Sequence, residues 1–149
     1  MADTYTNILY HIVFGPKQRR PLITPEIQPR LYEYLGGIIR AQRGVLYEIG
    51  GMNDHLHMLL RWNTDAIKDL VREMKSDSTK WIHATFPGHN DFYWQSGGGI
   101  FTVSQSVVPH LTNYIQNQAK HHKKRSFAEE YIEFLKINGI EYDERNLFD

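Results

Sequence analysis

Two histidines separated by one leucine, His55-Leu56-His57, are the residues whose types and spacing first suggest chemistry in this chain. In a β-strand alternate side chains point to the same face, so the two imidazoles share a face, with attachment points roughly 6–7 Å apart. Such a pair can bind one divalent ion, which needs a third ligand and an open position to do chemistry. Two ordinary surface histidines on a half-buried strand are the simpler alternative, and this stretch alone favours that alternative.

A second group of polar residues lies on a helix predicted from about Ser106 to His122. At 100° per residue, Tyr114 and Gln118 lie one turn apart, at one edge of the apolar stripe. That stripe consists of Val108, Leu111, Ile115 and Ala119.

These two side chains could complement the histidine pair. The amide oxygen of Gln118 is a hard ligand for Mg²⁺ or Mn²⁺ that adds no charge. Positive charge nearby favours the ionised, nucleophilic form of the Tyr114 phenol. Alternatively, Tyr114 packs with its hydroxyl in water and Gln118 is a surface amide. The two groups taken together favour a site over that alternative.

The elements that must position these residues follow from periodicity and turn residues. Strands are expected at 6–14, 45–49 and 55–62, with Gly50-Gly51 as a turn or bulge between the second and third. Residues 92–103 hold a fourth extended region, interrupted by Ser96 and the glycine triplet Gly97-Gly98-Gly99.

Four helices are expected. The first begins at Thr24 as N-cap with Pro25 as its first residue, and the second is capped by Asn63 or Thr64 and ends near Phe86. The third is the helix of Tyr114, and Ser126 with Glu129 forms a capping box for the fourth.

The element order β-α-β-β-α-β-α-α is typical of an α+β fold. It resembles a ferredoxin-like split βαβ antiparallel sheet with added C-terminal helices, which here carry Tyr114. At 149 residues we expect a single domain, 1–149, in which 1–104 form the sheet-and-helix body. Residues 105–149 then form the tyrosine helix and an acidic C-terminal helix and tail.

Composition excludes several classes of protein. The chain is 41% hydrophobic and 23% charged, which is typical of a globular protein, and it has no cysteine for disulfides or thiolate metal sites. No apolar run is long enough to cross a bilayer, and no signal-peptide pattern is present, so we expect no membrane partner and a cytoplasmic location.

The zero net charge hides an asymmetry. Residues 1–125 carry 15 lysines and arginines against 10 acids, whereas residues 126–149 carry 2 against 7. The basic body permits a polyanionic partner without requiring one. Candidate phosphate contacts are the basic clusters Lys17, Arg19, Arg20 and Lys120, Lys123, Lys124, Arg125.

Together these motifs resemble the single-tyrosine HUH transposases, the TnpA type of the smallest bacterial insertion sequences. Asp54-His55-Leu56-His57 is similar to the family's HUH motif, and Tyr114 to Gln118 is similar to its Tyr-x-x-x-Gln motif. Tyr10 to Phe14 with the basic loop, and Trp94-Gln95 between the two motifs, also match. One departure is Gly98, where relatives usually carry an aromatic residue.

The resemblance implies cleavage and rejoining of single-stranded DNA at hairpin-bearing element ends. Tyr114 would form a 5′-phosphotyrosine link, and His55, His57 and Gln118 would hold Mg²⁺ or Mn²⁺. Members of the family act as homodimers, and in many of them the tyrosine helix serves the partner's histidine pair. The glycine triplet is compatible with such an exchange.

Two other classes stay open at this stage. One is a single-stranded nucleic-acid-binding module without catalysis, although its aromatic signature is missing from the first and third strands. A domesticated, REP-associated tyrosine transposase would be a closer variant with the same chemistry. The other is a small metal-dependent hydrolase in which water, rather than Tyr114, attacks.

Overall fold

The computed structural model describes residues 2–62 and 66–149. Its described strands form one four-stranded antiparallel sheet in the order β2-β3-β1-β4. They are β1 (Leu9–Phe14), β2 (Val45–Met52), β3 (His55–Arg61) and β4 (Gly99–Val103). This order confirms the α+β, ferredoxin-like arrangement expected from the sequence, because β3 lies between the two strands that α1 connects.

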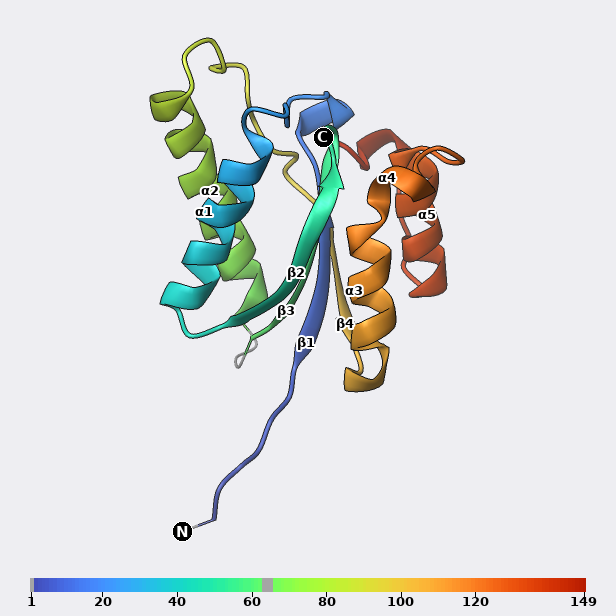
Figure 1. Cartoon of the computed structure of the whole chain (residues 1–149). Coiled ribbons are helices and arrows are strands. Elements are labelled where there is room, and N and C mark those ends of the chain that lie inside the picture. The colour runs from blue at the N-terminus through green and yellow to red at the C-terminus, as the bar shows by residue number, and fades with distance from the viewer. Residues whose placement is uncertain (1, 63–65) are drawn as a thin grey trace.

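Helices cover both faces of the sheet (Figure 1). On one face lie α1 (Gln28–Ala41) and α2 (Ile67–Thr85). On the other face lie α3 (Val108–Gln116), α4 (Gln118–His121) and α5 (Phe127–Ile137). Short 3-10 turns at Lys17–Arg19, Gln105–Val107 and Glu144–Asn146 complete the described elements.

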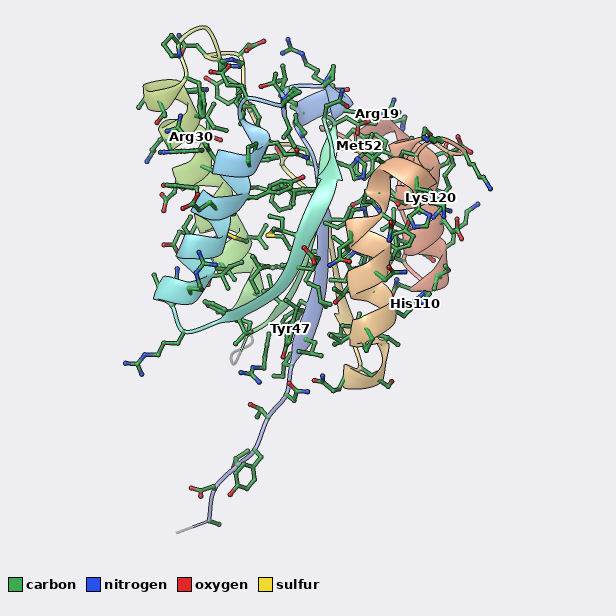
Figure 2. The ribbon with its side chains drawn as sticks, in the orientation of Figure 1. Arg19, Arg30, Tyr47, Met52, His110 and Lys120 are labelled. Carbon is green, nitrogen blue, oxygen red and sulfur yellow. The ribbon has the colours of Figure 1, made fainter. Side chains whose placement is uncertain are left out.

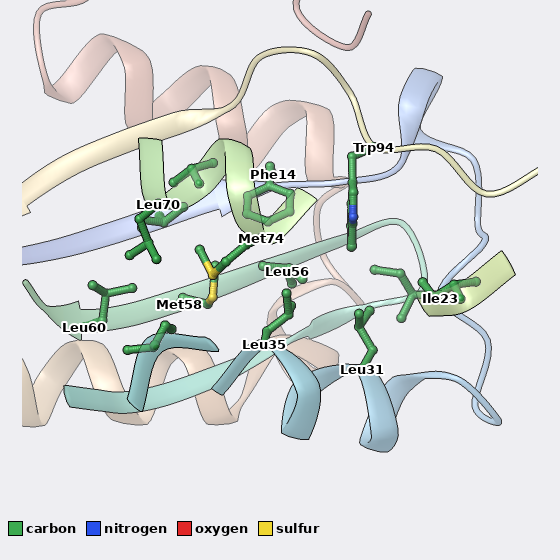
Figure 3. Packing of buried hydrophobic residues seen from close by; sticks show 14 of the residues in the cluster. Phe14, Ile23, Leu31, Leu35, Leu56, Met58, Leu60, Leu70, Met74 and Trp94 are labelled. Atoms are coloured by element: carbon green, nitrogen blue, oxygen red, sulfur yellow. The ribbon is translucent and has the colours of Figure 1, made fainter. Parts of the chain in front are cut away.

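Strand alternation divides the residues of β1 and β3 between two cores. Leu56, Met58 and Leu60 point toward α1 and α2, as the alternation predicts, and pack there against residues of both helices. Figure 3 shows this packing, with Leu31 and Leu35 of α1 and Leu70 and Met74 of α2. The opposite side chains of β1 and β3 point toward α3, α4 and α5. The functional candidates therefore lie on the side of the sheet that faces the C-terminal helices.

Several predicted boundaries were wrong. The β2-β3 turn lies at Asn53 and Asp54, whereas Gly50 and Gly51 are inside β2. A Cβ on Gly50 would lie 2.6 Å from the backbone oxygen of Ile115, so glycine permits close packing of α3 on the strand rather than a turn. The bulge lies instead between Leu46 and Glu48.

The first helix begins later than predicted. Thr24 accepts a hydrogen bond from the amide of Ile27 through Oγ1, but residues 25–27 form a turn and α1 starts at Gln28. The predicted cap of the second helix at Asn63 or Thr64 lies outside the described residues. The predicted end of the second helix near Phe86 and the capping box at Ser126 are confirmed.

The helix predicted from 106 to 122 is interrupted. Asn117 leaves helical geometry (φ −105°, ψ 28°) and separates α3 from α4. Because of this break Ala119, predicted in the apolar stripe, is exposed, while Gln118 is buried. The interruption thus turns a polar side chain toward the sheet.

Candidate active site

Strand β3 presents both histidines to the space beneath the C-terminal helices. His55 and His57 lie on the same face, as strand alternation predicts, but both are fully buried rather than at the surface. The ring of His55 stacks on Phe127 of α5, with centroids 4.1 Å apart. The alternative of two ordinary surface histidines is therefore wrong.

Each histidine has a partner on the ring nitrogen that faces away from the centre of this space. Nδ1 of His55 lies 2.8 Å from Oδ1 of Asp54. Nδ1 of His57 lies 2.8 Å from Nε2 of His11, a residue of β1. Such contacts fix ring orientation in metal sites and leave Nε2 directed at the ion.

The Nε2 atoms of both histidines point at polar groups of the C-terminal helices. Nε2 of His55 lies 2.8 Å from Oε1 of Gln118, and Nε2 of His57 lies 2.9 Å from Oε1 of Glu130. His122 approaches the same two side chains, with its Nε2 3.0 Å from Oε1 of Gln118 and 3.3 Å from Oε2 of Glu130.

Tyr114 completes this group. Its hydroxyl donates a hydrogen bond to Oε2 of Glu130 and accepts one from Nη2 of Arg125 at 3.0 Å. Burial and then the contact with Glu130 raise the pKa of Tyr114 to about 12, outweighing the opposite effect of Arg125. The positive charge of Arg125 alone therefore does not lower this pKa, because burial and then the contact with Glu130 have the larger effects.

Glu130 is ionised despite its burial. Burial alone would raise its pKa, but hydrogen bonds from His122 and His57 hold the pKa well below its usual range. In turn Glu130 raises the pKa of His122 against the opposing effect of burial. Burial and then the charge of His57 lower the pKa of His11 to about 3, so His11 is neutral near pH 7.

The structure thus brings together the four residues expected from the sequence, His55, His57, Tyr114 and Gln118. The sequence analysis did not identify Glu130 or His122 as residues of the site. A signal for Glu130 was present, since it lies among the apolar positions of α5, one residue before Tyr131 and four before Phe134. An acid on the buried face of a helix is seldom found without partners.

The donor atoms around His55 suit a cation. Because a carboxylate accepts hydrogen bonds, the contact with Asp54 places the proton of His55 on Nδ1 and leaves a lone pair on Nε2. That lone pair and the amide oxygen of Gln118, another acceptor, face each other at 2.8 Å. A shared positive charge, either a second proton or a metal ion, stabilises two facing acceptors.

Further ligands lie close to these atoms. Ligand atoms of His55, His122 and Glu130 lie within 4.8 Å of one another. The available donor set is therefore larger than the predicted set of His55, His57 and Gln118.

A cavity of about 230 Å³ reaches Tyr114 between α3 and α5. It is lined by His110, Leu111, Tyr114, Arg125, Glu130, Glu133, Phe134 and Ile137. A larger cavity of about 380 Å³ lies between α2 and the glycine triplet, and none of the candidate site residues lines it.

The candidate DNA-contact residues occupy two segments. Lys17, Arg19 and Arg20 are exposed, but Arg20 pairs with Asp91 at 3.1 Å, and the guanidinium of Arg19 lies 4.6 Å above the ring of Phe148. Figure 2 shows Arg19 and Lys120 toward the same end of the molecule as Met52, next to the β2-β3 turn.

In the second segment, Lys120, Lys123 and Lys124 are exposed. Arg125 is half-buried and contacts Tyr114 and Glu133. Arg125 therefore belongs to the surroundings of the tyrosine as much as to the surface.

Comparison with known proteins identifies the family. A family model described as "Transposase IS200 like" matches residues 4–118, which span β1 through Gln118. This chain belongs to the IS200-like transposase family. Its role as a transposase follows from that membership.

The relatives agree with this assignment. The transposases for insertion sequence element IS200 of Salmonella typhimurium and Salmonella typhi are each 26% identical over 129 residues, covering 83% of this chain and 84% of each relative.

Solved structures share the fold. A candidate transposase from Deinococcus radiodurans R1 aligns with a TM-score of 0.62 and 24% identity, covering 79% of this chain and 95% of that one. A REP-associated tyrosine transposase bound to a REP hairpin aligns with a TM-score of 0.60 and 17% identity, covering 82% and 73%.

None of the helices in the described part of this transposase has both the length and the apolarity needed to span a membrane.

Proposed function

We propose that this transposase cleaves and rejoins single-stranded DNA at insertion-sequence ends through a 5′-phosphotyrosine intermediate on Tyr114. The observation that supports this proposal is the convergence of the Tyr114 hydroxyl and the Nε2 atoms of His55 and His57 on one carboxylate, that of Glu130. A nucleophile and a pair of metal-binding side chains are thereby adjacent in one chain.

His55, His57 and Gln118 would hold Mg²⁺ or Mn²⁺. A bound divalent cation withdraws negative charge from a phosphate oxygen and makes the phosphorus more electrophilic. Asp54 contacts Nδ1 of His55 and His11 contacts Nδ1 of His57, and these contacts orient the two rings. The amide of Gln118 is in turn oriented by its Nε2 group, which donates to Glu130 at 3.3 Å.

The proposed step conserves the energy of the phosphodiester. Tyr114 loses its proton, its oxygen bonds to phosphorus, and the bond from phosphorus to the 3′ oxygen breaks. That oxygen takes up a proton, so one DNA end is a free 3′-OH and the other remains linked to the protein. The reverse attack by a 3′-OH reseals a strand without ATP.

Single-stranded DNA with hairpin ends is the proposed partner. The exposed lysines 120, 123 and 124, with Lys17 and Arg19, lie on segments toward one end of the molecule and offer positive charge to a DNA backbone. The relative of known structure that binds a REP hairpin shares this fold. As the family resemblance implies, we expect a homodimer.

Removal of the tyrosine hydroxyl tests the proposal. We expect wild-type protein with Mn²⁺ and hairpin-bearing oligonucleotides to give a slowly migrating protein–DNA adduct on a denaturing gel, and chelation of Mn²⁺ to abolish it. Tyr114→Phe should lose both adduct and cleavage, at least 1,000-fold, because no other oxygen replaces the nucleophile (~4 kcal/mol).

Tyr5→Phe is the matched control, since Tyr5 is 90% exposed and far along the chain from the site. Cleavage that persists in Tyr114→Phe would instead support a hydrolase in which water attacks. Binding of DNA without any cleavage by the wild type would support a non-catalytic binding module.

A further inference from the structure

The exposed side of α2 carries its charges in two separate stripes. At 100° per residue, Lys68, Arg72 and Lys75 lie within about 60° of one another around the helix. The acids of the helix lie in a second stripe, at four-residue spacing: Asp69, Glu73 and Asp77. The basic stripe faces away from α1, whereas Glu73 accepts a hydrogen bond at 2.9 Å from Gln42 at the end of α1.

The basic stripe forms one rim of the cavity of about 380 Å³ between α2 and the glycine triplet. Lys68, Arg72 and Lys75 are the only charged side chains among the described residues that line this cavity. Its floor is apolar and consists of Ile12, Phe14, Val71 and Ile100. Small ligands occupy pockets of about 300–1,000 Å³, so the cavity has room for a ligand that combines an apolar face with negative charge.

Lys75 holds the loop on the far side of the cavity. Its ammonium donates hydrogen bonds to the backbone oxygens of Gln95 at 3.0 Å, of Ser96 at 3.4 Å and of Gly97. Burial lowers the pKa of Lys75 to about 8. Because an ammonium group has three donors, Lys75 is committed to the loop, and Lys68 and Arg72 are the cations that the rim offers to a ligand.

The pairing of Arg72 leaves it available to an anion. Its Nη1 donates to Oδ1 of Asp69 at 2.9 Å, but the two side chains are 76% and 71% exposed. Water and salt screen such a pair, so it is weak. A phosphate can replace the carboxylate, since a guanidinium binds both groups with the same fork of donors.

A second cavity continues this surface along α2. It has a volume of about 490 Å³, shares Arg72 and Lys75 with the first cavity, and is also lined by Lys80 and Tyr93. The ring of Tyr93 is 54% exposed. An exposed aromatic ring beside a basic groove is typical of surfaces on which the bases of a single strand stack. The length of the surface therefore favours a strand over a free nucleotide.

We propose that the cavity between α2 and the glycine triplet binds one unpaired nucleotide of single-stranded DNA. The base lies over the apolar floor, and its phosphate lies against Lys68 and Arg72. None of the candidate active-site residues lines this cavity, so it is a second point of attachment for the strand. The proposal rests on the proposed function for the choice of single-stranded DNA as the ligand.

Loss of either rim cation tests the phosphate contact. Binding of a labelled thymidine oligonucleotide is measured by fluorescence anisotropy with a chelator present, so the measurement does not depend on cleavage. Lys68→Ala and Arg72→Ala should each weaken binding and lower the slope of log affinity against log salt by about 0.7, the value for one lost phosphate contact. Lys136→Ala removes the same charge from the exposed side of α5 and should leave the slope unchanged. Equal slopes in all three variants would overturn the proposal.

Gly97→Leu tests the position of the base. A Cβ at Gly97 meets no atom within 4 Å, so a leucine can be added at the wall of the cavity. We expect binding of the thymidine oligonucleotide to weaken about fivefold or more, the effect of one lost base contact. Binding of an abasic oligonucleotide of equal length, which has phosphates but no bases, should not change.

Gly37→Leu is the matched control, because Gly37 also has open space around it and lines a different cavity. Equal affinities of the two leucine variants for the thymidine oligonucleotide would contradict the proposal. Circular dichroism checks that each variant folds. If Gly97→Leu does not fold, the exposed variants Lys68→Ala and Arg72→Ala still decide the question.

Free thymidine 5′-monophosphate distinguishes a strand from a free nucleotide. We expect it to displace the oligonucleotide only weakly, because it lacks the neighbouring nucleotides that contact the rest of the surface. Full displacement at an equal concentration would overturn the proposal in favour of a nucleotide site.

The two proposals fail separately. A protein–DNA adduct in the wild type, with every cavity variant binding DNA like its control, would reject the cavity alone. Binding that depends on the cavity in a wild type that forms no adduct would support the cavity and reject the proposed function.

Discussion

At the scale of single residues, the geometry of the site depends on the contact that each histidine makes through Nδ1, the ring nitrogen that faces away from the centre of the site. Asp54 is next to His55 in the chain, and its carboxylate fixes the proton of that ring on Nδ1. His11 lies diagonally opposite His57 on the neighbouring strand β1, and its Nε2 lies 2.8 Å from Nδ1 of His57. The direction of both Nε2 atoms follows from these two contacts.

Neutral His11 makes the stability of the metal-free protein depend on pH. Its pKa is lowered from 6.5 to about 3 in the folded chain, so between these values the unfolded chain binds a proton that the folded chain does not. The stability that neutral His11 contributes is present above pH 6.5 and is lost as the pH falls toward 3.

We therefore expect the free energy of unfolding of the wild type to fall more than that of His11→Gln between pH 6.5 and 5, by at most about 2 kcal/mol. Glutamine keeps a polar partner for His57 but does not titrate. Urea unfolding in the presence of a chelator measures the difference. Equal losses of unfolding free energy in the two proteins would mean that folding does not lower the pKa of His11.

At the scale of elements, the interruption at Asn117 determines what α4 contributes. A continuous helix would place Gln118 along the line of Tyr114 at the edge of the stripe. The break instead buries Gln118 and leaves Ala119 exposed, while both Tyr114 and Gln118 still contact Glu130. The spacing Tyr-x-x-x-Gln therefore brings both groups to one carboxylate, although the helix is not regular between them.

The glycine triplet at the start of β4 is another segment whose role depends on its surroundings. Gly98 has a φ of +141°, and a Cβ there would lie 3.0 Å from both Cβ of Phe14 and the backbone oxygen of Val13. Gly97 has open space around it. An aromatic side chain at position 98 would not fit this conformation of the loop.

Gly98→Ala is accordingly expected to destabilise the fold by about 1–3 kcal/mol, because alanine is strained at this φ and crowds β1. Gly97→Ala is the matched control and should change stability by less than about 0.5 kcal/mol. Thermal or urea unfolding of the two variants measures this difference. Similar stabilities would show that the loop adjusts freely.

At the scale of the whole molecule, charge is separated along the chain and in space. The acidic C-terminal region covers part of the basic loop after β1, where Phe148 packs under Arg19 and the side chain of Asp149 accepts a hydrogen bond from Gln18. Around α4, in contrast, Lys120, Lys123 and Lys124 are exposed. The α4 lysines are thus the more available of the two clusters for a DNA backbone.

Salt dependence of DNA binding tests this difference. Lys123→Ala and Lys124→Ala should each weaken binding of single-stranded DNA and lower the slope of log affinity against log salt by about 0.7, the value for one lost phosphate contact. Lys136→Ala, an exposed lysine at the far end of α5, should leave the slope unchanged. An unchanged slope in all three variants would mean that the DNA backbone does not contact Lys123 or Lys124.

By itself, the sequence determined the face of the histidine pair, the order of elements and the family resemblance. The first two follow from periodicity, since alternation in a strand and spacing in a helix are local. The resemblance rests instead on motifs, above all Asp54 to His57 and Tyr114 to Gln118. Because the hydrophobic residues at 56, 58 and 60 occupy one face of the strand, His55 and His57 lie on the opposite face. The capping box at Ser126 likewise set the start of α5 from residues only three positions apart.

Only the tertiary structure decided which groups surround the histidines. Glu130 is on α5, His122 directly follows α4 and His11 is on β1. Their meeting with His57 and Tyr114 depends on how α5 packs across the sheet. Gly50 shows the same limit, since the pair Gly50-Gly51 predicts a turn or bulge, whereas the close approach of Ile115 explains a glycine inside a strand. Contacts between residues that are distant in sequence depend on how the elements pack, and the local periodicity of the sequence does not predict them.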